Sequence, residues 1–164
     1  MPLDHDGKAS VELSTAQDAR DFASQNITYR VSASVTDASL REVSASGQVI
    51  ATFRPFNIFT ALNRGYAPTG TPVQASITAA TADGAKIAHA KGTSVLQHIR
   101  ADGSREALET WNITTGKEGE ATLSFQTRES GLYALSSTLK DEHGNRVEES
   151  FQFLSSVSYT HLRA

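Results

Sequence analysis

Two stretches of this 164-residue chain repeat each other, and this repeat constrains the fold more than any other feature. Residues 29–37 and 133–141 both begin with tyrosine, alternate apolar and polar side chains, and end in aspartate, at an offset of 104 positions. The segments before them, residues 7–15 and 119–127, share an opening glycine, alternating apolar positions and a closing threonine at an offset of 112. Because strict alternation is the period of a half-buried strand, each copy predicts β-strands. A period near one hundred residues indicates tandem domains.

The repeat predicts an all-β chain of tandem antiparallel seven-stranded β-sandwiches, of which the first is incomplete. Residues 1–55 are expected to hold the C-terminal strands of a truncated unit, at 9–15, 27–36 and 47–54. Residues 16–25 are expected to form a solvated loop, with a single helical turn at 18–22 as the alternative. Three strands with one apolar face leave an uncovered sheet, which favours missing strands over contact with the neighbouring unit.

Residues 56–154 are expected to form a complete sandwich. Alternating segments separated by turn residues predict strands near 56–62, 73–79, 86–100, 105–115, 121–127, 132–140 and 146–154, with an irregularity near Lys91 and Gly92. Seven strands without a convincing helix are typical of a sandwich. The predicted core is aromatic and aliphatic: Trp111, Phe125, Tyr133, Leu135, Phe151 and Phe153. Residues 155–164 match neither copy and are expected to be a sequence artefact or a linker.

Charge and composition exclude several classes of function. The formal net charge is −3 with both signs interspersed, so no basic stripe predicts nucleic-acid binding and no polybasic segment predicts membrane contact. The chain has no cysteine, which excludes disulfides, thiolate metal sites and cysteine nucleophiles. It is hydrophobic enough, at 38 %, to bury a core.

The side chains that could carry chemistry are scattered. Glu148 and Glu149 are adjacent on a predicted strand, so they point to opposite faces and cannot act as an acid–base pair. A metal site needs convergent ligands, and the histidines do not cluster in sequence: His5, His89, His98, His143 and His161. We therefore predict no catalytic residue, no cofactor-binding residue, no metal ligand and no enzymatic activity.

Several motifs carry a resemblance to a known family. Residues 29–39 are similar to a closing strand, and Arg64-Gly65-Tyr66 with Pro68 and Gly70 to the opening of a following domain, although Thr69 and Thr71 depart from that pattern. Residues 82–84, 111–115 and 131–144 complete the set. Together, over residues 5–154, they resemble macroglobulin domains of bacterial alpha-2-macroglobulin-like proteins.

The resemblance implies a part of an exported protein that traps proteases. In that family a protease cleaves a bait segment and is caged, and many members carry a Cys-Gly-Glu-Gln thioester, which a chain without cysteine cannot hold. This chain would be architectural, with neighbouring macroglobulin domains of the same protein and the trapped proteases as partners, in the periplasm or outside the cell.

Two other classes of protein remain open. An immunoglobulin-like spacer of a bacterial surface adhesin or cell-wall protein would also be built from tandem sandwiches. A carbohydrate-binding sandwich would need an exposed aromatic platform, whereas most aromatic residues here are expected in the core.

Overall fold

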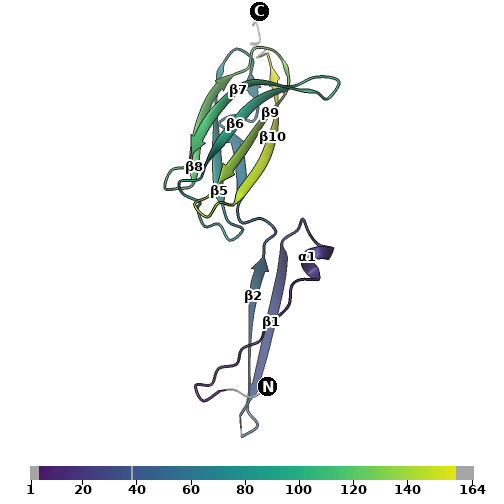
Figure 1. The fold of residues 1–164 in the computed structure, drawn as a ribbon, viewed down its shortest axis with the longest axis vertical. Helices are drawn as coiled ribbons and strands as arrows, with labels where there is room; N and C mark the ends of the chain where they lie inside the picture. The colour runs from purple at the N-terminus through teal and green to yellow at the C-terminus, as the bar shows by residue number, and fades with distance from the viewer. Residues whose placement is uncertain (1–3, 38, 158–164) are drawn as a thin grey trace, which may run out of the picture. The chain divides into compact units, whose positions relative to one another are not determined.

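The computed structural model describes residues 4–37 and 39–157 and divides the chain into two compact units. Unit 1 runs to Phe53 and unit 2 begins at Arg54. Strands make up nearly all of the regular structure in both units (Figure 1). The predicted all-β class is therefore confirmed.

Unit 1 is a long β-hairpin with a short helix. Strand β1 (Ile27–Thr36) pairs antiparallel with β2 (Glu42–Ala51), in continuous register from Ile27 opposite Ala51 to Thr36 opposite Glu42. Helix α1 (Asp18–Asp21) forms where a solvated loop was favoured, so that preference is wrong for these four residues. The hydroxyl of Tyr29 donates a hydrogen bond to Asp18 Oδ2 at 2.6 Å and so holds the turn against the hairpin.

Two predicted strands of unit 1 need correction. Residues 9–15 form no strand in the structure, because none of the described residues of unit 1 pairs with them. The strand predicted at 47–54 instead spans 42–51, since the short turn after β1 returns the chain at Glu42 and pairing with β1 ends at Ala51.

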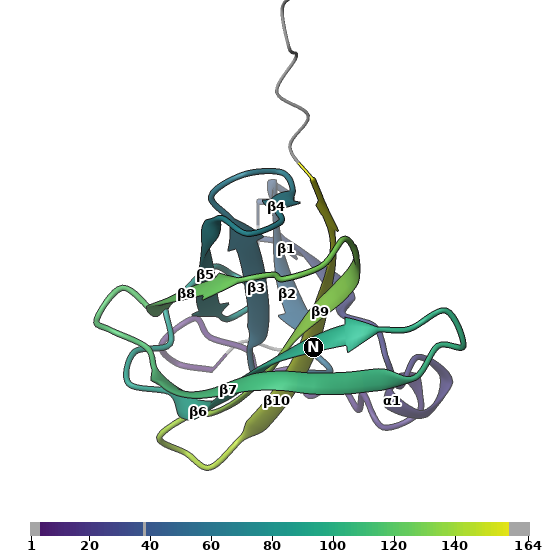
Figure 2. The same ribbon diagram turned by 90° about the horizontal axis from the view of Figure 1, so that it is seen from above.

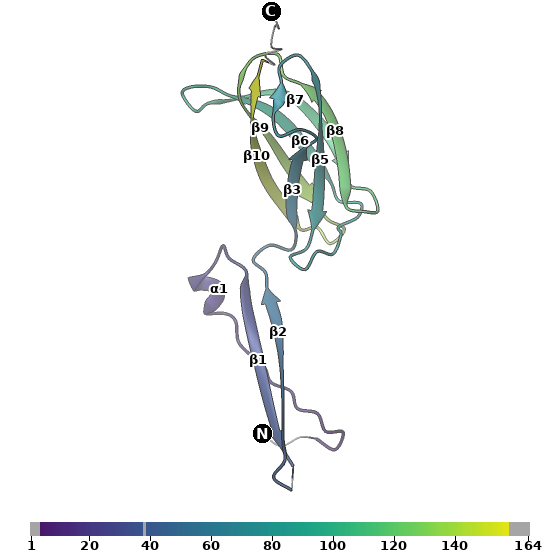
Figure 3. The same cartoon turned by 180° about the vertical axis from the view of Figure 1, so that it is seen from behind.

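Unit 2 is a β-sandwich of immunoglobulin-like type. Its five-stranded sheet has the order β4-β10-β9-β6-β7 and its three-stranded sheet the order β3-β5-β8; the two layers face each other in Figures 2 and 3. All long strand pairs are antiparallel, whereas β4 pairs parallel with β10. The strands are β3 (Asn57–Leu62), β4 (Ala67–Pro68), β5 (Pro72–Ala80), β6 (Lys91–Ile99), β7 (Arg105–Thr114), β8 (Glu120–Gln126), β9 (Gly131–Lys140) and β10 (Arg146–Ser156).

One hydrophobic core fills the space between the two sheets. Of the predicted core residues, four are buried: Phe125, Tyr133, Leu135 and Phe153. Trp111 and Phe151 are only partly buried at its margin. Trp111 lies on β7, the last strand of its sheet, where its indole meets the ring of Phe125 at a centroid distance of 6.3 Å. Alternation identified the face of this strand correctly but not its position at the sheet edge.

Three further boundaries differ from the prediction. Strand β6 begins at Lys91 rather than at 86, and the irregularity lies at Leu96/Gln97 in its pairing with β7, not at Gly92. Gly92 instead permits close strand contact, since a Cβ there would collide with the carbonyl of Thr138. Strand β10 continues to Ser156, so the predicted tail is wrong at its first two positions. Residues 158–164, including His161, lie outside the described residues.

Candidate interaction surface

The structure keeps the described histidines apart. Across residues 4–37 and 39–157, no group of three or more His, Asp or Glu side chains converges as metal ligands would. His143 lies in the turn between β9 and β10, as predicted from its position beside Gly144. The same described part of the chain contains no helix long and apolar enough to cross a bilayer.

A cleft in unit 2 lies beside His98 and has a volume of about 510 Å³. The imidazole of His98 stacks on the ring of Tyr133, with centroids 4.8 Å apart, and the Tyr133 hydroxyl donates to the Glu129 carbonyl at 3.0 Å. Burial raises the pKa of Tyr133, and the charge of Glu129 acts in the same direction. The lining contains no serine or threonine, and the Tyr133 hydroxyl is engaged by the Glu129 carbonyl. Its aromatic pair serves packing.

The most unusual surface of the molecule is one face of the β1–β2 hairpin. Residues directly opposite in an antiparallel pair share a face, and on one face every position is apolar or glycine. Valines on it are strongly exposed: Val31 is 43 % exposed, Val49 63 % and Val43 71 %. We call this set the hairpin face: Ile27, Tyr29, Val31, Ala33, Val35, Val43, Ala45, Gly47, Val49 and Ala51.

The opposite face of the same hairpin is mostly polar. Serine, threonine, arginine, glutamine and glutamate occupy its positions, with Ile50 as the apolar exception. A hairpin with one apolar and one polar face is normally buried on the apolar side. If solvent covered both faces, nothing would favour apolar residues on one of them. The hairpin face is therefore patterned as the inner surface of a sandwich.

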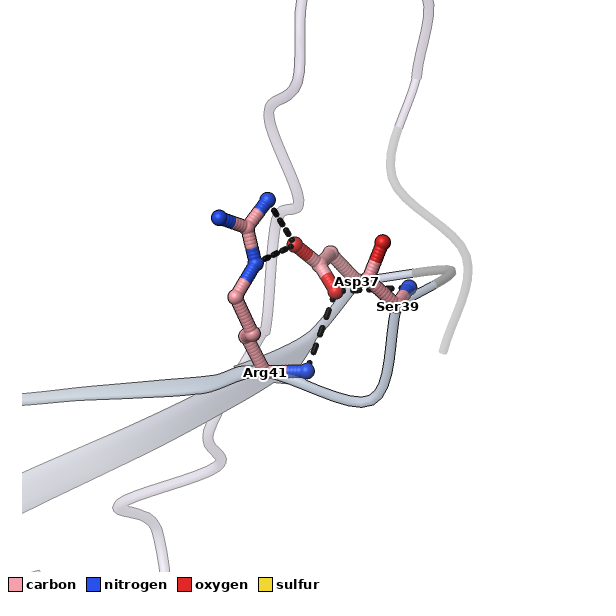
Figure 4. Close-up of polar contacts among 3 residues, drawn as sticks. All are labelled: Asp37, Ser39 and Arg41. Atoms are coloured by element: carbon pink, nitrogen blue, oxygen red, sulfur yellow. Dashed lines mark hydrogen bonds and ion pairs between the residues drawn. The ribbon is translucent and has the colours of Figure 1, made fainter.

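The turn that joins β1 and β2 is fixed by Asp37 (Figure 4). Asp37 Oδ1 accepts from the backbone N–H of Ser39 at 2.8 Å and of Arg41 at 3.0 Å, and Oδ2 accepts from Arg41 Nε at 2.9 Å. These bonds lower the pKa of Asp37; the backbone N–H of Arg41 has the largest effect, and burial opposes it without reversing the direction. Leu40 occupies the left-handed region of this turn at φ 63°.

The β9–β10 hairpin of unit 2 uses the same turn at the repeat offset. Asp141 Oδ1 accepts from the backbone N–H of His143 at 3.0 Å and of Asn145 at 2.8 Å, and its Oδ2 accepts from the Asn145 side chain. Gly144, at φ 89°, stands where unit 1 has Leu40. The ladders also correspond residue by residue, since Tyr29 opposite Val49 repeats Tyr133 opposite Phe153.

The earlier half of the repeat shows the same correspondence at its turns. The N–H of Asp4 bonds the carbonyl of Lys8, as the N–H of Gly116 bonds that of Glu120. The fourth residues of these turns, Gly7 and Gly119, have φ values of 73° and 70°. The offset of 112 is therefore present in backbone geometry as well as in sequence.

Sequence reasoning missed part of the hairpin face. It placed β1 on an apolar face but did not assign residues 42–46 to a strand. The signal was the alternation of Val43, Ala45 and Val49 with polar neighbours, weakened by small side chains and by Gly47.

Comparisons with known proteins give structural likenesses only. No protein-family model matches the chain, and no curated protein matches it. A tetra-tandem repeat from the extending region of a large adhesion protein is 18 % identical, with a TM-score of 0.44 over 80 % of this chain and 32 % of that one. Adhesin InvE of Yersinia pseudotuberculosis is 10 % identical, with a TM-score of 0.40 over 79 % of this chain and 49 % of that one.

A third similar structure is the PKD domain of an M14-like peptidase from a Thermoplasmatales archaeon, which is 14 % identical. Its TM-score is 0.36, over 62 % of this chain and 93 % of that one. The function proposed below rests on the repeat and the surfaces of the chain itself.

Proposed function

We propose that this chain is an architectural part of a larger protein, in which β-sandwich units follow one another and hold other regions at a set spacing. The observation that carries the proposal is the repeated hairpin, with the same register and the same aspartate turn at an offset of 104 residues. Unit 2, over its described residues 54–157, has the length of one period. A duplicated module of this kind adds length without needing a reactive site.

The surfaces support a spacer over a catalyst. The cleft beside His98 is lined by side chains engaged in packing and by charged residues of both signs, without serine or threonine. The aromatic side chains of unit 2 are mostly internal, which removes the flat exposed platform that a carbohydrate-binding sandwich would use. The units therefore supply rigid length and connect neighbouring regions of the parent protein.

The experiment is a replacement in the full-length parent protein. Deleting residues 54–157 should shorten its maximum dimension in small-angle scattering by about 35 Å, the length of a ten-residue strand such as β9. Replacing the same residues by an unrelated sandwich of equal length should restore both the dimension and the parent's activity. Loss of activity in the replacement, at restored length, would show that unit 2 acts directly and would contradict the proposal.

The finer form of the proposal is that the array belongs to a macroglobulin-type protease trap, exported to the periplasm or cell surface. The ordered motifs from Tyr29 to Gly144 support it. The neighbouring domains of the same protein and the trapped proteases would then be its partners. The parent should protect large substrates from a protease while small peptides remain cleavable, because a cage excludes by size. Equal loss of both activities, or loss of neither, would contradict the trap, and the second outcome would favour a spacer in a surface adhesin.

A further inference from the structure

The hairpin face has a covered counterpart in unit 2, which shows what fits against it. At the same register positions, Tyr133, Leu135 and Leu139 of β9 belong to the single core of the sandwich. That core is closed by the three-stranded sheet, through the inner side chains of β3, β5 and β8. In unit 1, none of the described residues forms such a sheet.

Residues 8–14 are the repeat counterpart of one strand of this cover. At the offset of 112 they correspond to β8, where Leu123 and Phe125 are buried. Their counterparts Val11 and Leu13 are 66 % and 60 % exposed. Strand β8 is held by hydrogen-bonded pairing with β5, and no described residue of unit 1 takes the place of β5. An isolated strand has no partner for its backbone, so residues 8–14 stay irregular.

We propose that the hairpin face and residues 8–14 together form a docking surface for strands with the alternating small apolar pattern of β3 and β5. The inference rests on the proposed array. In unit 2 the strands β3 and β5 precede β8 in the chain, so the occupant is a segment of the same polypeptide on the N-terminal side of Asp4. Such strand addition uses main-chain bonds for affinity and alternate side-chain positions for specificity.

A second copy of the chain fits this surface less well. Its β3 and β5 are already built into its own unit 2, where Ile58, Val73 and Ile77 are buried. It would offer another hairpin face, which leaves Val11 and Leu13 without a strand of the β5 type. The occupant must pair with residues 8–14 and cover the valines at once, as the three-stranded sheet of unit 2 does.

The probe is the chain extended at its N-terminus by a copy of its own residues 54–115, joined directly to Asp4. This junction follows the turn correspondence between Asp4 and Gly116. Hydrogen exchange read by mass spectrometry can follow residues 8–14 and 27–51, which occur once in the extended chain. We expect the amides of residues 8–14 to exchange at least tenfold more slowly than in the unextended chain, because they gain hydrogen-bond partners.

Two variants of the extended chain test the face. Val31→Asp places a charge on the hairpin face and should abolish the added protection, whereas Ser32→Asp, on the opposite face, should leave it intact. Gly47→Phe restores the side chain that unit 2 carries at Phe151. It fills the cavity that the smaller residues of the hairpin face would leave in the core of the completed first unit.

The proposal is overturned if neither the extended chain nor its Gly47→Phe form protects residues 8–14. It is also overturned if the unextended chain associates in sedimentation and Val31→Asp abolishes that association, since a second copy would then be the occupant. Residues 116–157 report on unit 2 in the same samples. If they stay protected while residues 8–14 do not, the docking surface fails and the spacer role of unit 2 stands.

Discussion

The β1–β2 and β9–β10 hairpins share a register, an aspartate turn and six identical residues, yet their inner faces meet opposite environments. Tyr133 and Val147 are buried in a two-layer core, whereas Val43, the counterpart of Val147, is 71 % exposed. Pairing and turn geometry are thus local properties of the hairpin, because they recur without the rest of the sandwich. Burial is not local, since it needs the second sheet.

The comparison is sharpest at the paired tyrosines, where we expect the largest effect. Tyr133→Ala should destabilise unit 2 by about 3–5 kcal/mol, the cost of removing a large buried aromatic ring together with its hydrogen bond to Glu129. Tyr29→Ala should instead loosen helix α1, whose Asp18 loses its hydroxyl donor, with little change in the unfolding of unit 2. Urea unfolding followed by Trp111 fluorescence reports on unit 2 alone, and equal losses in the two variants would contradict the comparison.

The paired valines give a matched substitution of intermediate size. Val147→Ala removes two buried methyl groups and should cost about 2 kcal/mol. Val43→Ala at the equivalent exposed position should change stability by less than about 0.5 kcal/mol. Differential scanning calorimetry of both variants checks this. A cost at Val43 close to that at Val147 would mean that the hairpin face is covered in the chain as it stands.

The paired aspartates, Asp37 and Asp141, test the turn geometry that the two hairpins share. Asp141→Ala should cost about 1 kcal/mol, the scale of a solvent-exposed capping side chain. Burial raises the pKa of Asp141, but hydrogen bonds from the side chain and backbone of Asn145 and from the His143 backbone outweigh it and lower the pKa overall.

A lowered pKa in the folded state sets the sign of the pH dependence. Stability from Asp141 is fully present above the unfolded pKa near 3.9 and is lost as the pH falls through the folded value. Unfolding midpoints of wild type and Asp141→Asn should therefore converge as the pH falls below the unfolded pKa of about 3.9. A constant difference from pH 7 to pH 2 would show that the carboxylate charge has no role in the turn.

The smallest effect concerns the left-handed position of the two turns, where unit 1 has Leu40 and unit 2 has Gly144. Leu40→Gly removes a non-glycine residue from the left-handed region and should stabilise the β1–β2 hairpin by about 0.5 kcal/mol, after the entropy of glycine is subtracted. Gly144→Leu should have the opposite sign in unit 2. Amide exchange of residues 27–36 and 131–140 measures both. A faster exchange in Leu40→Gly would show that side-chain contacts of Leu40 outweigh its backbone strain.

The sequence was sufficient to predict features that neighbouring residues determine. It was insufficient for features that depend on strands far away along the chain. Alternation and the aspartate turns predicted β1, β9 and β10, and alternation placed Tyr133 and Phe153 inside, whereas β2 was predicted only from residue 47 onward. It could not show that residues 9–15 lack a partner, because their pattern is that of a strand in either case. Helix α1 was only the alternative to a loop for a similar reason, since four residues have little helical preference of their own and depend on Tyr29.

The parallel pairing of β4 with β10 gives unit 2 a mechanical property. Ala67 and Pro68 lie opposite Ser155 and Ser156, and the N–H of Thr69 donates to the Ser156 carbonyl at 3.0 Å. In a parallel pair the incoming end of one strand and the outgoing end of the other lie at opposite ends of the ladder. Strand β3 lies between Arg54 and β4, so tension between the two ends of unit 2 reaches β4 once β3 has separated from β5. It then slides β4 along β10 and loads these bonds together, instead of opening them one at a time. The contact is only two residue pairs long, so it resists a steady pull briefly and yields before the core does.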